Sequence, residues 1–188
     1  EQIELFQQAD VVLAIGPILR DALYDRLGSS KTVLMLIPGL AEIEPRLAPK
    51  TFTAFLSGRL SDDAAKIKQV HLGIAAFAKA HREARENSMP DGLCKQPNLL
   101  LRGVDFESPT TQLTQADPET ELKIFAEGYA ACVINLHAMP YTHDRKEYYN
   151  DLRSASVALM PSWHEGFGLA AWEAIAAGVP LIISKNSG

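Results

Sequence analysis

The chain has 188 residues, of which 47% are hydrophobic and 22% are charged, enough apolar material for a substantial core. Its formal net charge of −5 argues against a nucleic-acid partner, and no stretch approaches the roughly 18 consecutive apolar residues of a membrane span. The two cysteines, Cys94 and Cys132, are too few for a disulfide framework and too far apart for a metal-ligand spacing, which favours a cytoplasmic location.

The N-terminal part of the chain alternates apolar runs with one helical pattern. Residues 11–15 predict a buried strand, and a helix then opens at Pro17 and ends at Gly28. The apolar face of this helix consists of Leu19, Ala22, Leu23 and Leu27. A second strand is predicted over residues 32–37, and segment 40–50, with its prolines and mixed charges, is typical of a linker.

The rest of the chain continues this alternation. Further strands are predicted over residues 52–57, 98–101, 132–136, 157–160 and 179–184. Helices are predicted over residues 119–131 and 145–153 and in the apolar run after Gly168. An earlier helix has a clear single face, made of Ile67, Val70, Ile74, Phe77 and His81. This order predicts an α/β fold, a Rossmann-like parallel sheet with helices on both faces.

Residues 161–180 are the most informative segment, because they place two glutamates in otherwise apolar sequence. Glu173 lies in a run of Ala, Leu, Ile and Trp that is typical of a helix buried nearly all round. An unpaired carboxylate there would cost several kcal/mol, so we expect Glu173 to face a polar cleft or a ligand. Glu165 lies earlier, in a Gly-containing loop between a predicted strand and this helix. A strand, a loop with a carboxylate and a helix N-terminus are typical of a sugar-phosphate site.

The same residues resemble the signature of the retaining nucleotide-sugar glycosyltransferases with two Rossmann domains, the GT-B type, and specifically of their family four. In that signature, two glutamates separated by seven residues flank a Gly-Phe-Gly-Leu turn. The matching residues are Pro161, Ser162, Glu165, Gly166, Phe167, Gly168, Leu169, Glu173, Ala174, Gly178, Val179 and Pro180. A dinucleotide fingerprint also fits Gly166, Gly168 and Ala171, but five residues separate it from its strand and no acid follows within residues 181–188.

The resemblance implies two unequal parts. Residues 1–50 are similar to the tail of the N-terminal, acceptor-side domain plus the linker, and residues 51–188 to the donor-binding Rossmann-like domain, truncated at its C-terminus. The chain departs from the family pattern at Pro38-Gly39, where the usual Asn between the two is absent. We therefore expect the C-terminal half of a GT-B fold, incomplete at both ends and belonging to a longer chain.

The donor diphosphate needs fixed positive potential, because its negative charge grows as the glycosidic bond breaks. Arg59 offers a bidentate phosphate contact. A lysine of the next helix would add a point charge. Alignment with the family favours Lys68, and Lys66 is the second candidate. For both residues, the alternative is an ordinary solvated lysine. Helix N-terminal amides come from Gly166, Phe167, Gly168 and Leu169. These groups replace a divalent metal, so neither a metal nor a cofactor is expected.

By resemblance, Glu165 contacts hydroxyls of the donor sugar and Glu173 contacts the ribose of a UDP-, GDP- or ADP-sugar. A carboxylate can accept hydrogen bonds from two neighbouring hydroxyls; for Glu173, a buried salt bridge is the alternative. The loop at residues 139–142 follows a predicted strand and should lie at the carboxyl edge of the sheet, where the family binds the nucleobase. An ordinary surface loop remains the alternative there, and His143 and His164 carry little signal.

Three functions fit the sequence. The leading one is the donor domain of a retaining, metal-independent hexosyltransferase that uses a nucleotide-diphosphate sugar and an unknown acceptor. This chain alone should be inactive, since catalysis needs both domains. The second is a non-catalytic nucleotide or nucleotide-sugar binding module within a larger signalling or defence protein, and the third is an interaction scaffold. The presence of Arg59, Glu165 and Glu173 favours the first two.

Overall fold

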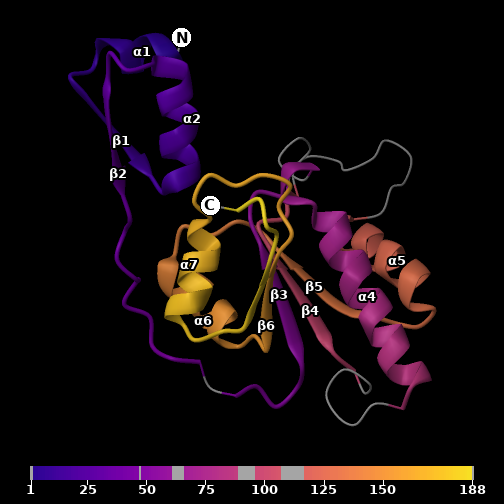
Figure 1. Ribbon diagram of the computed structural model, residues 1–188. Helices are drawn as coiled ribbons and strands as arrows, with labels where there is room; N and C mark the ends of the chain where they lie inside the picture. Colours follow the sequence, from indigo (N-terminus) through magenta and orange to yellow (C-terminus); the bar gives the residue numbers. More distant parts are fainter. Residues whose placement is uncertain (1, 47, 61–65, 89–95, 107–116, 188) are drawn as a thin grey trace.

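The computed structural model describes residues 2–46, 48–60, 66–88, 96–106 and 117–187. Within these ranges, two parallel sheets are joined by an extended linker (Figure 1). The helices and strands are α1 (Gln2–Gln8), β1 (Val11–Ile15), α2 (Pro17–Leu27), β2 (Thr32–Leu36), β3 (Thr53–Ser57), α4 (Val70–Glu86), β4 (Asn98–Arg102), α5 (Pro118–Ala130), β5 (Asn135–Met139), α6 (Arg145–Arg153), β6 (Val157–Met160), α7 (Leu169–Ala176) and β7 (Leu181–Ile183).

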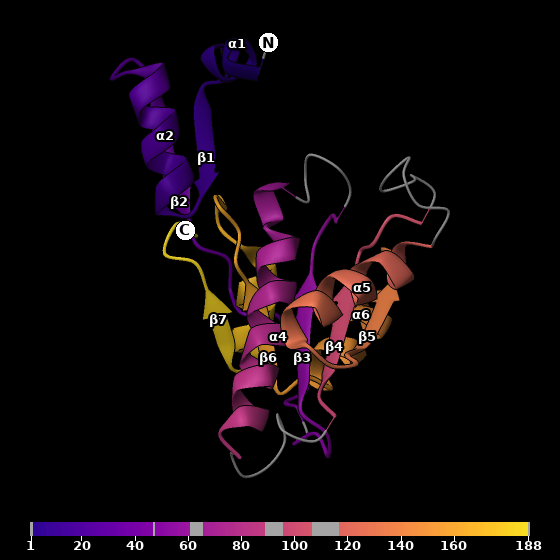
Figure 2. The same cartoon turned by 90° about the vertical axis from the view of Figure 1, so that its right-hand side faces the viewer.

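The larger sheet has five strands in the order β5-β4-β3-β6-β7, and every neighbouring pair is parallel. Helices α4 and α5 cover one face, while α6 and α7 cover the other (Figures 1 and 2). This confirms the predicted Rossmann-like α/β fold. The chain leaves β3 in one direction through β4 and β5 and then returns to β6 on its other side. Open α/β sheets bind ligands beyond the carboxyl ends of the strands at such a switch point.

The central strand β3 feeds two apolar cores because its side chains alternate between the two faces. Ala54 and Leu56 belong to the core under α4 and α5, and Phe55 belongs to the core under α6 and α7. All three side chains are buried. A strand flanked by parallel neighbours and covered on both faces requires this nearly continuous apolar sequence.

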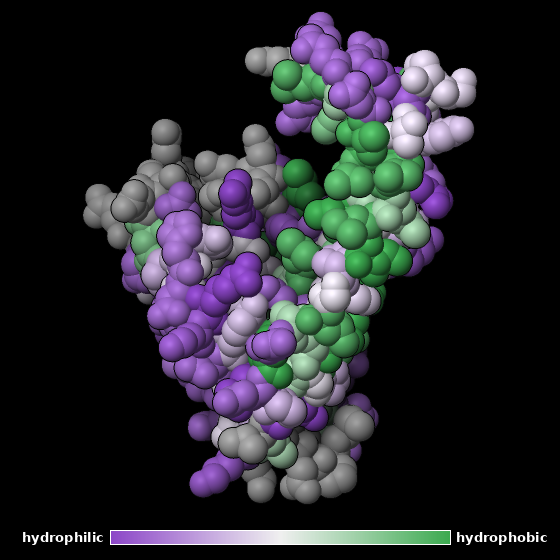
Figure 3. All heavy atoms as spheres, turned by 90° about the vertical axis from the view of Figure 1, so that its left-hand side faces the viewer, coloured by the Kyte–Doolittle hydropathy of each residue, from purple (hydrophilic) through white to green (hydrophobic). Residues whose placement is uncertain are grey.

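The smaller sheet pairs β1 with β2, in register from Val11 with Thr32 onward. Val12 and Ala14 are buried, but Val11 is 49% exposed and Leu13 is 63% exposed. The prediction of a buried strand is therefore wrong for one of its faces, and Figure 3 shows apolar side chains gathered on the surface of this N-terminal unit. The predicted apolar face of α2 is covered only in part: Leu27 is buried, whereas Leu19 and Ala22 are exposed, since a sheet of only two strands leaves the helix few partners.

Three other predictions need correction. Strand β5 begins at Asn135 rather than at residue 132, because Ala131 ends α5 in a left-handed conformation and the chain needs the next residues to reach the sheet. Gln69 has a positive φ of 51°, so α4 starts at Val70 and leaves Ile67 mostly exposed. Helix α7 is not buried all round, since Ile175 faces solvent. The sequence also predicts loops at residues 61–63, 86–97 and 103–118, from their polar, Gly- and Pro-containing composition, and these lie partly or wholly outside the described residues.

The segment between the two sheets, which includes the predicted linker, packs against α6 and α7. The indole Nε1 of Trp172 donates to the carbonyl oxygens of Pro38 at 3.1 Å and Gly39 at 3.2 Å. Further along, the Arg46 amide donates to the Ala177 carbonyl at 2.9 Å. The linker therefore runs along the ends of α6 and α7, while the division into domains at residue 50 stays a prediction. In the described part of the chain, no helix is long and apolar enough to cross a membrane.

Candidate functional site

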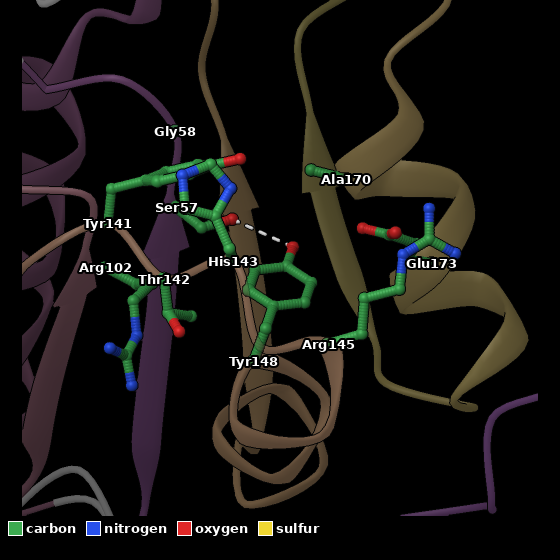
Figure 4. A pocket seen from close by; sticks show the side chains of 10 residues that line it. All are labelled: Ser57, Gly58, Arg102, Tyr141, Thr142, His143, Arg145, Tyr148, Ala170 and Glu173. Atoms are coloured by element: carbon green, nitrogen blue, oxygen red, sulfur yellow. Dashed lines mark hydrogen bonds between the residues drawn. The ribbon is translucent and has the colours of Figure 1, made fainter.

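A cavity of about 380 Å³ lies at the carboxyl end of the larger sheet, beside the switch point (Figure 4). Its walls come from the ends of β3 and β4, the loop after β5, α6 and α7. The lining residues are Ser57, Gly58, Arg102, Tyr141, Thr142, His143, Arg145, Tyr148, Ala170 and Glu173. The prediction that the loop at residues 139–142 reaches this edge of the sheet is confirmed, although Met139 itself is the last residue of β5.

Two glycines bring the ends of β3 and β4 together beside the cavity. Gly103 has a φ of 102°, and a Cβ atom there would lie 1.8 Å from the carbonyl oxygen of Gly58. The Gly58 amide donates to the Arg102 carbonyl at 3.1 Å, so β3 and β4 stay paired to their ends. Only glycine permits this approach of two backbones. The approach fixes the position from which Arg59 leaves the strand.

Glu173 lines the cavity, half-buried on the first turns of α7. Burial raises the pKa of its carboxyl above the ordinary 4.5, whereas the hydroxyls of Tyr148 and Tyr149 and the charge of Arg145 act in the opposite direction. Among the described residues, no basic nitrogen lies within 4.0 Å of this carboxylate. The geometry therefore favours a carboxylate aimed at the cavity over the alternative of a salt bridge.

Tyr148 supports this wall from α6. Its hydroxyl forms a hydrogen bond of 3.1 Å with Oγ of Ser57, drawn as a dashed line in Figure 4. Burial raises the pKa of the Tyr148 phenol above its ordinary 10.0, so the hydroxyl stays protonated at neutral pH. Its ring also packs edge-on against Phe55 at 5.8 Å between centroids. Tyr148 therefore joins the core to the polar lining.

Lys68 and Glu165 form an ion pair beside Gly58. Their side chains are only 26% and 22% exposed, and Ser162 Oγ donates to the same carboxylate at 3.3 Å. The stem of Lys68 lies 3.4 Å from the place where Gly58 would carry a Cβ. The alternative of a solvated lysine does not hold for Lys68, whereas Lys66 is exposed.

The loop before α7 leaves its backbone amides available. The amides of residues 166–169 donate no hydrogen bond to any acceptor in the part of the chain that the structure describes. Gly168 caps the helix with a φ of 80°, and a Cβ there would lie 2.7 Å from the methyl carbon of Met160. The ring of Phe167 packs against Gly16 in the turn between β1 and α2. It also packs edge-on against Trp172, with 5.4 Å between the ring centroids.

The remaining predicted site residue, Arg59, is exposed directly after Gly58. Its guanidinium forms no hydrogen bond or ion pair with any residue that the structure describes. The structure thus places Lys68 and Glu165 together and Glu173 in the adjoining cavity, but it gives Arg59 no partner within the described ranges. His164 is exposed on the loop that precedes Glu165.

Sequence reasoning missed several cavity residues. Ser57 is the last residue of one predicted strand and Arg102 directly follows another, so the rule that ligands bind at carboxyl ends could have indicated them. Arg145 and Tyr148 had no such signal, because they lie on a helix whose orientation depends on packing. His143 is exposed, as expected for a single histidine without a partner spacing, and it also lines the cavity edge-on to Tyr141, 4.9 Å between ring centroids.

Comparison with known proteins decides the family. A family model described as "Family 4 Glycosyltransferase in conflict systems" matches residues 1–188. The chain belongs to this family. The predicted resemblance to family four of the glycosyltransferases is thereby confirmed. Glu165 lies in the loop that precedes α7, and Glu173 lies on α7 itself.

Solved structures share the fold of this chain. Sucrose-phosphate synthase from Thermosynechococcus elongatus aligns with a TM-score of 0.68 and 20% identity, over 100% of this chain and 43% of its own. Anabaena HepE in complex with UDP and glucose aligns with a TM-score of 0.62 and 14% identity, over 99% of this chain and 47% of its own. The chain thus spans less than half the length of either structure.

One sequence relative is a GDP-mannose-dependent alpha-(1-6)-phosphatidylinositol dimannoside mannosyltransferase from Mycobacterium tuberculosis, strain ATCC 25177 / H37Ra. It is 47% identical over 47 residues, which are 25% of this chain and 12% of that protein. The likeness is therefore strong but local.

Proposed function

We propose that this chain binds the nucleotide-sugar donor of a retaining glycosyltransferase that transfers a hexose to an acceptor. The observation that carries the proposal is the position of Glu173. Its half-buried carboxylate lines a cavity at the carboxyl edge of the sheet without a basic partner within 4.0 Å among the described residues. Such a group needs hydrogen-bond donors to offset its burial, and the two hydroxyls of a ribose supply them.

The neighbouring groups extend the site from the nucleoside to the diphosphate and the sugar. Lys68 and the amides of residues 166–169 provide positive potential next to the cavity, and Arg59 adds an exposed guanidinium directly after Gly58. Glu165 would exchange part of its bond with Lys68 for hydroxyls of the donor sugar. Retention of configuration and independence of metal ions are inferred from the signature around the two glutamates.

Calorimetric titration with UDP, GDP and ADP tests the binding part of the proposal. The best of the three should lose affinity more than about tenfold when its 2′ and 3′ hydroxyls are removed, because two hydrogen bonds to a charged group disappear. Unchanged affinity of the dideoxy nucleotide would refute the role of Glu173, and the absence of binding by all three would refute the site.

Transfer is tested separately with the full-length protein and the corresponding nucleotide sugars. Release of nucleotide together with a product of unchanged anomeric configuration supports a retaining transferase. Nucleotide binding without any transfer or hydrolysis would favour the non-catalytic binding module instead.

A further inference from the structure

Arg102 is the most deeply buried charge among the residues that line the cavity, with 4% of its surface exposed. It is the last residue of β4, and its guanidinium reaches three partners. Nη1 donates to the Pro140 carbonyl at 3.2 Å, Nη2 donates to Oε1 of Glu147 at 2.9 Å, and Nε donates to Oδ2 of Asp151 at 2.9 Å. One side chain thus ties the end of β4 to α6 and to the loop before it.

This network continues into the loop that walls the cavity. The second oxygen of Glu147, Oε2, accepts from Oγ1 of Thr142 at 2.7 Å, and the same Oγ1 accepts from the Asp144 amide at 3.1 Å. Asp144 in turn caps α6, accepting from the Lys146 amide at 2.8 Å. The loop conformation that places Tyr141 and His143 on the cavity is therefore held by bonds that begin at Arg102.

The electrostatics agree with this arrangement. Hydrogen bonds from Thr142 and Arg102 lower the pKa of the Glu147 carboxyl, so it stays ionised at neutral pH. The bonds to Arg102 are charge-assisted and strong for that reason. Lysine could not replace them, because its single ammonium cannot reach two carboxylates and a carbonyl in a fixed plane.

We infer that Arg102 is a positioning residue for nucleotide recognition, which acts through Glu147 to hold the loop at residues 140–144 against the bound nucleoside. This inference rests on the proposed function, since it assigns the loop to the nucleoside end of the same cavity. Glu147 does not line the cavity. Its contribution to affinity is therefore indirect and can be separated from contact with the ligand.

The test compares Glu147→Gln with Lys146→Gln. Both variants neutralise one exposed charge on adjacent residues of α6, but only Glu147 belongs to the network. Glu147→Gln should raise the dissociation constant of the best-binding nucleotide among UDP, GDP and ADP about three- to tenfold, because charge-assisted bonds become neutral ones. Its melting temperature should stay close to that of the wild type, and Lys146→Gln should leave both quantities unchanged.

Hydrogen exchange without ligand provides a second readout. Backbone amides of residues 141–144 should exchange faster in Glu147→Gln and in Arg102→Lys than in the wild type, while those of α4 on the opposite face stay protected. Faster exchange together with weaker binding supports the inference. If the wild type binds a nucleotide and Glu147→Gln binds it equally well, the inference is wrong and the proposed function stands. If no nucleotide binds the wild type, both fall.

Discussion

Glu173→Gln should separate stability from binding, because the two depend on the charge of this side chain in opposite directions. The amide keeps the shape of the carboxylate and one oxygen acceptor, but it carries no charge. Burial raises the pKa of Glu173 above 4.5 in the folded protein. The ionised form is therefore disfavoured by folding, and the neutral variant should be as stable as the wild type or more stable.

The pH dependence follows from the same shift. When the pKa of a carboxyl is higher in the folded state than in the unfolded state, its ionisation lowers the free energy of unfolding. This loss begins as pH rises past the unfolded-state pKa and is complete above the folded-state pKa. The advantage of Glu173→Gln should therefore be present at pH 7 and disappear as pH falls below about 4.5. Carboxyls with lowered pKa values, such as that of Glu147, titrate in both proteins and cancel in the difference.

Nucleotide affinity should change in the other direction. Hydrogen bonds from ribose hydroxyls to a charged acceptor are worth about 1.5–3 kcal/mol, which is roughly a 10- to 150-fold increase in the dissociation constant. Because only the ionised form accepts from both hydroxyls, wild-type affinity should also fall as pH is lowered toward the raised pKa of Glu173. The variant should lack this part of the pH dependence.

Urea denaturation and calorimetric titration of both proteins at pH 7 and pH 5 measure these quantities. Glu83→Gln, on the exposed side of α4, controls for the loss of one negative charge. A loss of about 3–5 kcal/mol in stability with unchanged affinity would contradict the argument, because that pattern marks one half of an internal salt bridge.

Three further outcomes are expected. Gly103→Ala should lower the free energy of unfolding, measured by urea denaturation, by at least about 3 kcal/mol, since its Cβ would lie 1.8 Å from the Gly58 oxygen at a φ of 102°. A loss below about 1 kcal/mol, on the order of an ordinary surface change, would show that the backbones at residues 58 and 103 can move apart. Lys68→Met should weaken UDP or GDP about tenfold but leave the matching nucleoside unaffected, and an equal loss for both would remove Lys68 from the diphosphate site. Donor binding and transfer by the full-length protein should persist in excess EDTA, because Lys68, Arg59 and the amides of residues 166–169 supply the positive potential; strict dependence on Mg²⁺ or Mn²⁺ would disprove this.

Local sequence patterns were sufficient for most of the fold. The apolar run at β3, the steps of three and four in α4 and the Pro–Gly punctuation of α2 are short-range signals. Each predicts its element because period and end residues depend on backbone geometry alone. The motif around Glu165 and Glu173 likewise indicated a site, because a carboxylate in apolar sequence calls for a polar surrounding wherever the helix packs.

The same patterns could not predict which apolar side chains of β1 are exposed to solvent. The run of β1 is as apolar as that of β3, yet Leu13 is 63% exposed while Leu56 is buried. Hydrophobicity reports what a strand can bury, whereas the number of layers around it determines what it does bury. The two-stranded sheet provides cover on one face only.

The composition of the cavity was decided by tertiary structure. Arg102 is at the end of β4, Tyr148 and Arg145 lie on α6, and Glu173 lies on α7. The distances between side chains on these different elements cannot be inferred from their separation in the sequence. Sequence alone predicted a polar surrounding for Glu173 and a phosphate contact for Lys68 or Lys66, and the phosphate contact stays a prediction. The crossover from β5 back to β6 brings the carboxyl ends of strands distant in sequence to one edge of the sheet. This arrangement determines which lysine pairs with Glu165 and which side chains surround Glu173.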